Sequence, residues 1–308
     1  MSTPALALPP TMRVFERGWL SSNNILFSGD HGSALVDSGY LSHAAQTVAL
    51  VEHALDGRPL DLLLNTHLHS DHCGGNAALQ ARYPDCITAI PAAEAAAVAA
   101  WDEAALSYRA TGQQCARFGF TRTIAAGDTL TLGELEWQAL AAPGHDNAAL
   151  VLYCARHAIL ISADALWEHG FGVIFPELDG DSGFAEAAAT LALIDSLDVR
   201  VVIPGHGAPF TDIQAALARA SSRLAYLRAD PRRNADNAVR VMLKFLLLER
   251  RQLSMAEVTA MFEHNPLMAG ARRRFLGGDA AAAAEHTAAA LVRAGAARRD
   301  GVLLIDCV

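Results

Sequence analysis

The segment from Asn65 to Asn76, NTHLHSDHCGGN, concentrates side chains that bind metal ions. His67 and His69 alternate at the end of an apolar run, so in an extended strand both point to one face. Asp71 and His72 follow where the chain would turn into a helix, and they can face a second position close by. Imidazole and carboxylate are the ligands that zinc and similar metals take. With 12 histidines in 308 residues, this spacing is expected by chance in on the order of one chain in a thousand.

Three more potential ligands each follow the end of an apolar run: His145 in PGH, Asp164 in SAD and His206 in PGHG. Loops at strand ends are where α/β folds gather functional groups. A glycine beside each of the two histidines lets the backbone approach closely. Any of the histidines taken alone is more simply interpreted as a hydrogen-bonded core residue. The ordered set predicts a metal centre.

This ordered set resembles the metallo-β-lactamase superfamily over about residues 12–212. The resemblance implies a four-layer αβ/βα sandwich with two divalent metal ions at one edge. It implies three ligands for the first metal, His67, His69 and His145. It implies three for the second, Asp71, His72 and His206, with Asp164 bridging both. Asp37, in the segment SALVDSG, would support a ligand rather than bind metal itself.

The metals would lower the pKa of a shared water and stabilise negative charge on a carbonyl or phosphoryl oxygen. By the same resemblance, Asp71 would be catalytic, orienting the nucleophile or passing a proton to the leaving group. Zinc is the first expectation, and iron or manganese also suits these ligands. A glutamate at position 69 would resemble the diiron flavoprotein branch, so His69 favours hydrolysis.

The elements that must position these residues are short strands with helices between them. Expected strands cover 24–27, 33–37, 60–65, 149–154, 157–162 and 200–203, with a hairpin of 129–132 and 135–141 around Gly133-Glu134. Helices are expected over 43–55 and 183–196. The alanine-rich stretch 90–120 is expected to be helical, and its aromatic residues form either core or a lid. Two sets of strands with helices outside predict a layered α/β architecture.

After Ile213 the pattern becomes helical, with helices expected over 213–228, 236–251, 255–264 (capped by Ser254) and 285–294. A hairpin over 297–307, turning at Asp300-Gly301, would complete a winged-helix-like layout. We therefore expect a catalytic domain of residues 1–222 and a smaller, mainly helical domain of 223–308. The net charge of −9 is uneven, since the 14 basic and 9 acidic residues from Arg223 onward give that part +5.

The substrate is less constrained than the metal site, because this fold hosts many reactions. Trp167, His169 and Phe171 follow Asp164 and are candidate substrate-binding residues. An apolar wall there favours an acyl thioester or related carboxylic ester. The C-terminal helices, Asn265-Pro266 and Arg272–Arg274 are faintly similar to the glyoxalase II group of thioester hydrolases.

Other activities remain open. They are a phosphodiesterase or ribonuclease, a lactonase, a sulfur-dioxygenating iron enzyme, and a regulator whose C-terminal domain touches DNA or a partner. The acidic main domain disfavours nucleic acid, so a small-molecule substrate is expected. The sequence shows no secretory signal and no membrane-length apolar run, which predicts a cytoplasmic protein without a membrane partner. A homodimer is possible. The five cysteines form no CxxC pair and are expected to be free core thiols, with Cys73 beside the histidine cluster.

Overall fold

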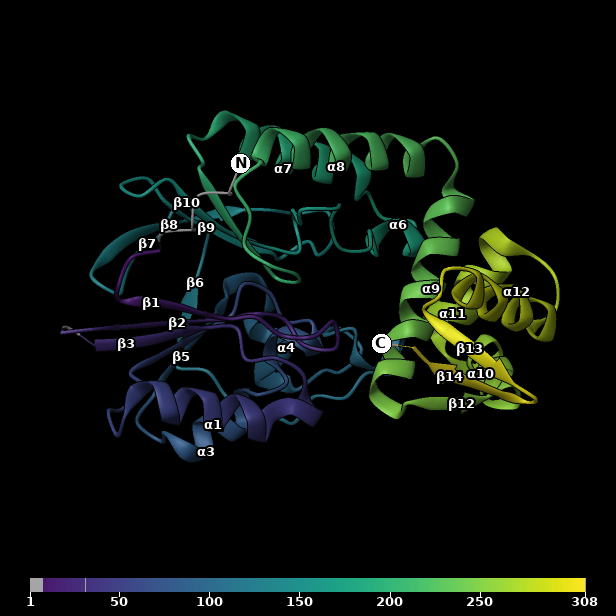
Figure 1. Cartoon of the computed structure of the whole chain (residues 1–308), viewed down its shortest axis with the longest axis horizontal. Helices are drawn as coiled ribbons and strands as arrows, with labels where there is room; N and C mark the ends of the chain where they lie inside the picture. Colours follow the sequence, from purple (N-terminus) through teal and green to yellow (C-terminus); the bar gives the residue numbers. More distant parts are fainter. Residues whose placement is uncertain (1–7, 31, 308) are drawn as a thin grey trace.

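The computed structural model describes residues 8–30 and 32–307. Two β-sheets form its centre (Figure 1). The first sheet contains, in spatial order, β1 (Met12–Phe15), β2 (Asn24–Gly29), β3 (Gly32–Val36), β4 (Leu62–Leu64), β5 (Ile87–Pro91) and β6 (Arg122–Ile124). The second contains, in spatial order, β11 (Val201–Pro204), β10 (Ile159–Ala163), β9 (Leu150–Cys154), β8 (Leu135–Ala141) and β7 (Thr129–Leu132). Strands β3 to β6 pair in parallel, as do β10 and β11, and the other pairs are antiparallel.

Strand alternation divides the core into layers. On β2, Phe27 packs between the two sheets, whereas its neighbour Leu26 packs against the outer helices of the first sheet. On β10, Ile161 faces the inner core and Leu160 faces the outer helices of the second sheet. Because successive side chains of a strand point to opposite faces, each sheet needs apolar cover on both sides.

Helices supply that outer cover (Figure 1). Against the first sheet lie α1 (Ala44–Leu55) and α3 (Asn76–Arg82), and against the second lie α7 (Phe184–Ser196) and α8 (Ile213–Arg228). The result is the expected αβ/βα sandwich. The β7–β8 hairpin also forms as predicted, because Gly133 and Glu134 both adopt the positive φ angles that a tight hairpin turn requires.

The stretch 90–120 is less helical than its composition predicts. It holds the short helices η2 (Ala92–Glu94), α4 (Ala95–Ala100) and α5 (Tyr108–Thr111), and much of the rest is irregular. Tyr108 and Phe118 are buried in one cluster with Trp101 packed against them, and Trp101 ends α4 with φ +53. Burial of these rings outweighs alanine's helix propensity, so the aromatic residues form core rather than a lid.

The C-terminal region is mainly helical and contains α9 (Pro231–Arg250), β12 (Gln252–Ser254), α10 (Met255–His264), α11 (Pro266–Ala271), η3 (Arg272–Leu276), α12 (Ala280–Arg293), β13 (Ala297–Asp300) and β14 (Leu303–Asp306). The expected hairpin β13–β14 forms, and β12 adds a third strand beside β14. Helices α9 and α12 begin earlier than predicted, because Asp230 and Asp279 cap them. Sequence reasoning missed α11, η3 and β12.

Helix α9 stands between the sandwich and the remaining C-terminal elements (Figure 1). Its buried residues form the centre of a cluster that also includes Val173 and Leu178 of the main region. Helix α8 runs across the expected division at residues 222 and 223, and that division stays a prediction. Within the described residues, no helix is long and apolar enough to cross a membrane. The five cysteines are free, and Cys73, Cys86 and Cys154 are buried.

Candidate metal centre

The histidine-rich loop follows β4 and leads into the short helix α2 (Ser70–Cys73). Buried hydrogen bonds hold its shape: Asn65 donates to the His72 carbonyl at 3.1 Å, and Asn76 donates to the Asn65 side chain at 2.7 Å. Gly74 and Gly75 follow where the backbone passes close to residues 38–41. A Cβ on Gly75 would lie 2.4 Å from the Ser38 carbonyl oxygen, so no larger residue fits there without a shift.

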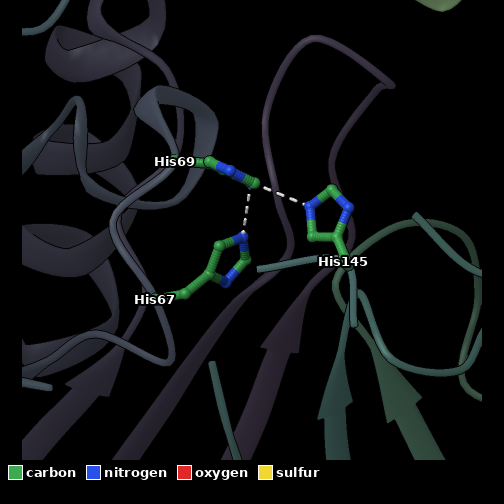
Figure 2. Close-up of side chains that lie close together, drawn as sticks. All are labelled: His67, His69 and His145. Carbon is green, nitrogen blue, oxygen red and sulfur yellow. Dashed lines mark hydrogen bonds between the residues drawn. The ribbon is translucent and has the colours of Figure 1, made fainter. Parts of the chain in front are cut away.

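Three histidines from two strand ends meet at one point (Figure 2). His69 Nδ1 lies 3.1 Å from His67 Nε2 and 2.8 Å from His145 Nε2. His145 is oriented from behind, because its Nδ1 donates to the Val173 carbonyl at 2.5 Å. Burial lowers the pKa of His67 well below its ordinary value, and burial next to His69 lowers the pKa of His145 to about 4. Burial also lowers the pKa of His69, so all three rings offer uncharged nitrogens, the form that binds metal.

A second group forms beside the first. His206 Nε2 lies 3.1 Å from Asp71 Oδ2, and His72 Nε2 lies 3.3 Å from Asp164 Oδ1. Asp164 stands between the two groups, since its other oxygen, Oδ2, lies 3.4 Å from His145 Nε2. The structure thus brings together all seven predicted metal ligands, with Asp164 between the two groups.

Asp37 lies behind His72 and not in the cluster itself. Its Oδ2 accepts a hydrogen bond from His72 Nδ1 at 2.8 Å, and its Oδ1 accepts from the Thr66 amide at 2.9 Å. This contact fixes the ring so that Nε2 faces the cluster. Within the described residues, buried His72 Nε2 makes no hydrogen bond. Buried polar atoms rarely lack a partner. A bound cation would supply that partner, so the donor set fits divalent metal ions.

Two of the three proposed substrate residues lie at the cluster. Trp167 donates from Nε1 to Asp164 Oδ1 at 3.3 Å. Trp167 and the buried Phe171 both line a pocket that opens at the cluster. The structure does not bring His169 to the cluster. The chain reverses between Trp167 and Gly170, whose backbones are hydrogen-bonded at 2.7 Å. The turn directs the His169 side chain to Glu168 and solvent, with 79% of it exposed.

We call this pocket the metal pocket. Several of the residues that line it were not predicted from the sequence. Among its additional residues are Trp19, Phe175, Arg223, Val241, Met242 and Phe245. Trp19 stacks on His206 with ring centroids 5.5 Å apart, and it meets Trp167 edge-on at 5.4 Å. No motif marks Trp19, and α9 reads in the sequence only as an amphipathic helix. Only one feature of the sequence could have indicated a binding role for Trp19: it lies in Gly18-Trp19-Leu20, outside any predicted helix or strand.

Comparison with known proteins agrees with this geometry. The family model of the metallo-beta-lactamase superfamily matches residues 17–206, which is more than half of the chain. The chain belongs to the metallo-β-lactamase superfamily. The predicted resemblance is confirmed, and superfamily membership together with the clustered ligands indicates a site for divalent metal ions.

Members of the superfamily resemble the chain to different extents. A hydroxyacylglutathione hydrolase from Brucella anthropi is 28% identical over 168 residues, covering 54% of this chain and 53% of the relative. The chain thus spans about half the length of the curated relatives it matches. A β-lactamase domain protein from Burkholderia ambifaria shares the fold with a TM-score of 0.59, at 20% identity over 99% of this chain and 96% of that one. The protein TTHA1623, solved in a di-iron-bound form, has a TM-score of 0.55 at 25% identity, over 68% and 98% of the two chains.

Proposed function

We propose that this chain is a metal-dependent hydrolase that uses two divalent metal ions to cleave an acyl thioester or a related carboxylic ester. The observation that carries the proposal is the position of Asp164, which faces both groups of histidines at the floor of an aromatic pocket. The name of the curated relatives, hydroxyacylglutathione hydrolase, supports a thioester substrate. The di-iron form of TTHA1623 supports a dinuclear site.

Each of the two groups of ligands would bind one metal ion. His67, His69 and His145 would hold the first ion, Asp71, His72 and His206 the second, and Asp164 would contact both. We propose zinc as the first choice, because imidazole and carboxylate suit it, and iron and manganese suit the same set. Bound there, the ions would polarise the scissile carbonyl and acidify a water molecule.

The protein's own groups then position the reaction. Asp71 lines the metal pocket and lies next to His206, so its carboxylate can take a proton from water and deliver it to the leaving thiol. Trp19, Trp167 and Phe175 wall the pocket with aromatic rings. A largely apolar wall favours a neutral acyl group over a phosphodiester backbone, so we propose a small-molecule substrate. The cytoplasmic location and the homodimer stay predictions.

The proposal is tested with two probes given side by side to purified, zinc-loaded protein. One is an acyl thioester, followed by release of free thiol, and the other is an activated phosphodiester. A double variant, Asp71→Ala with His72→Ala, removes two ligands of the second ion. A matched control, His53→Ala with Asp85→Ala, removes the same residue types at exposed positions outside the site. We expect thiol release that the control retains and the ligand variant loses. Phosphodiester cleavage without thiol release would contradict the proposal.

A further inference from the structure

A second cavity adjoins the metal pocket along α9. Its apolar walls come from Trp19, Trp167, Val241, Phe245, Leu248 and Leu291, and we call it the α9 groove. The groove has a volume of about 380 Å³, against about 100 Å³ for the metal pocket. The metal pocket alone therefore holds the reacting centre of a substrate but little of its remainder.

The two cavities adjoin and share part of their lining. Trp19, Trp167, Val241 and Phe245 line both of them. Since Trp19 also stacks on His206, the groove begins directly beside a proposed metal ligand. A substrate with its carbonyl at the metals would extend along α9 toward α12.

The described residues that line the groove offer apolar surface without a free charge. Their two cationic side chains are already paired: Lys244 Nζ lies 2.5 Å from Asp306 Oδ1, and Arg240 lies 3.3 Å from Asp236. Lys244 also donates to the carbonyls of Ala296 and Cys307. At the same time, 57% of Trp19 and 41% of Val241 are exposed. Large apolar side chains left exposed beside a reactive site are typical of a ligand-binding surface.

We propose that the α9 groove binds the hydrocarbon chain of the acyl group, so that the preferred substrates are thioesters of medium- or long-chain acids. This inference rests on the proposed thioester hydrolysis. The acyl chain is a better occupant than the thiol half, because common thiol carriers bear carboxylates or phosphates. Among the described residues that line the groove, both cations, Arg240 and Lys244, are already paired with aspartates.

The direct test varies the acyl chain from two to twelve carbons on one constant thiol. Each methylene buried in the groove adds a transfer free energy of about 0.8 kcal/mol, which corresponds to about a fourfold increase in kcat/KM. We expect the increase to continue until the groove is filled and then to level off. A flat dependence on chain length would overturn the proposal.

Two variants, one at the C-terminal cap of α12 and one on the helix itself, locate the effect. Ala294 is exposed and lines the groove, so Ala294→Trp should fill its far end. Ala289 is an exposed alanine of α12 outside the groove lining, so Ala289→Trp is the matched control. We expect Ala294→Trp to lower kcat/KM for the dodecanoyl thioester at least tenfold and to leave the acetyl thioester within twofold. Ala289→Trp should change neither.

Calorimetric binding of dodecanoate separates this inference from the proposed function. Dodecanoate binding that only Ala294→Trp weakens would support the groove even if no thioester were cleaved. Acetyl thioester cleavage with no chain-length effect and no dodecanoate binding would retain the hydrolase and overturn the groove proposal. Dimerisation that Ala294→Trp abolishes, with a flat chain-length dependence, would instead assign the groove to a second copy of the chain.

Discussion

Replacing Asp37 by asparagine tests whether the residue behind His72 controls the metal site. Both side chains are buried, and the Asp37 carboxylate accepts hydrogen bonds from His72 Nδ1, the Thr66 amide and the Thr66 hydroxyl. Asparagine keeps one oxygen for the Thr66 amide but presents an NH₂ group to His72 Nδ1. That donor favours the tautomer with hydrogen on Nε2, which removes the lone pair that a metal ion needs.

The expected loss follows from this contact. Removing a partner that orients a ligating histidine costs about 10- to 100-fold in metal affinity, or about 1.4 to 2.8 kcal/mol. The assay loads the protein with zinc, dialyses it against graded chelator and measures zinc per chain by mass spectrometry. Asp37→Asn should lose the metal of the His72 group at lower chelator concentration than the wild type.

Asp61→Asn is the matched control. Its carboxylate likewise accepts from a backbone amide and a hydroxyl, both of Ser33, but it lies outside the metal pocket. Asp61→Asn should retain zinc like the wild type. If Asp37→Asn released its zinc at the same chelator concentration as the wild type, the tautomer argument would be refuted.

Three further perturbations have defined outcomes. Removing the metals with a chelator should abolish hydrolysis and lower Tm, because a ligand at 1,000 times its Kd stabilises the folded state by about 4 kcal/mol. Calorimetry with and without added zinc checks this prediction, and an unchanged Tm would contradict it. Gly205→Ala places a Cβ 2.2 Å from Asp164 Oδ1 and should lower kcat about 100-fold, whereas Gly119→Ala, with no atom within 4 Å of its Cβ, should leave kcat unchanged. Ser254→Ala removes the helix cap whose hydroxyl accepts from the Glu257 amide and should cost about 1 kcal/mol at pH 7 with activity retained. Because hydrogen bonds from Ser254 lower the pKa of Glu257, their stabilisation is present above the ordinary carboxyl pKa and fades as pH falls through the lowered one. Ser254→Ala removes the hydroxyl's bond to the Glu257 carboxylate and keeps the backbone bond. Urea unfolding should thus show a smaller Ser254→Ala effect at pH 3 than at pH 7, and an equal effect would argue against a contribution from the hydroxyl–carboxylate bond.

The seven predicted ligands could be found in the sequence because binding chemistry restricts them to histidine and aspartate at strand ends. His67 and His69 share a face through the two-residue period of a strand, and that relation needs no tertiary information. The same holds for the Gly133-Glu134 turn and the Ser254 cap, where local geometry requires particular residue types. Such features depend on neighbours in the chain, so the sequence displays them.

The walls of the metal pocket could not be found in this way. Trp19 and Phe245 are far apart in the chain, and only the packing of α9 against the sandwich brings them to one cavity. The turn between Trp167 and Gly170 decided that the His169 side chain faces solvent. In residues 90–120, the burial of aromatic rings outweighed helix propensity. The sequence by itself determined the seven candidate ligands and the layered fold, through local spacing and residue chemistry. Tertiary structure alone decided the shape of the metal pocket and the α9 groove. Each apolar residue there packs against several others that are distant in sequence, so the contacts leave no fixed spacing along the chain.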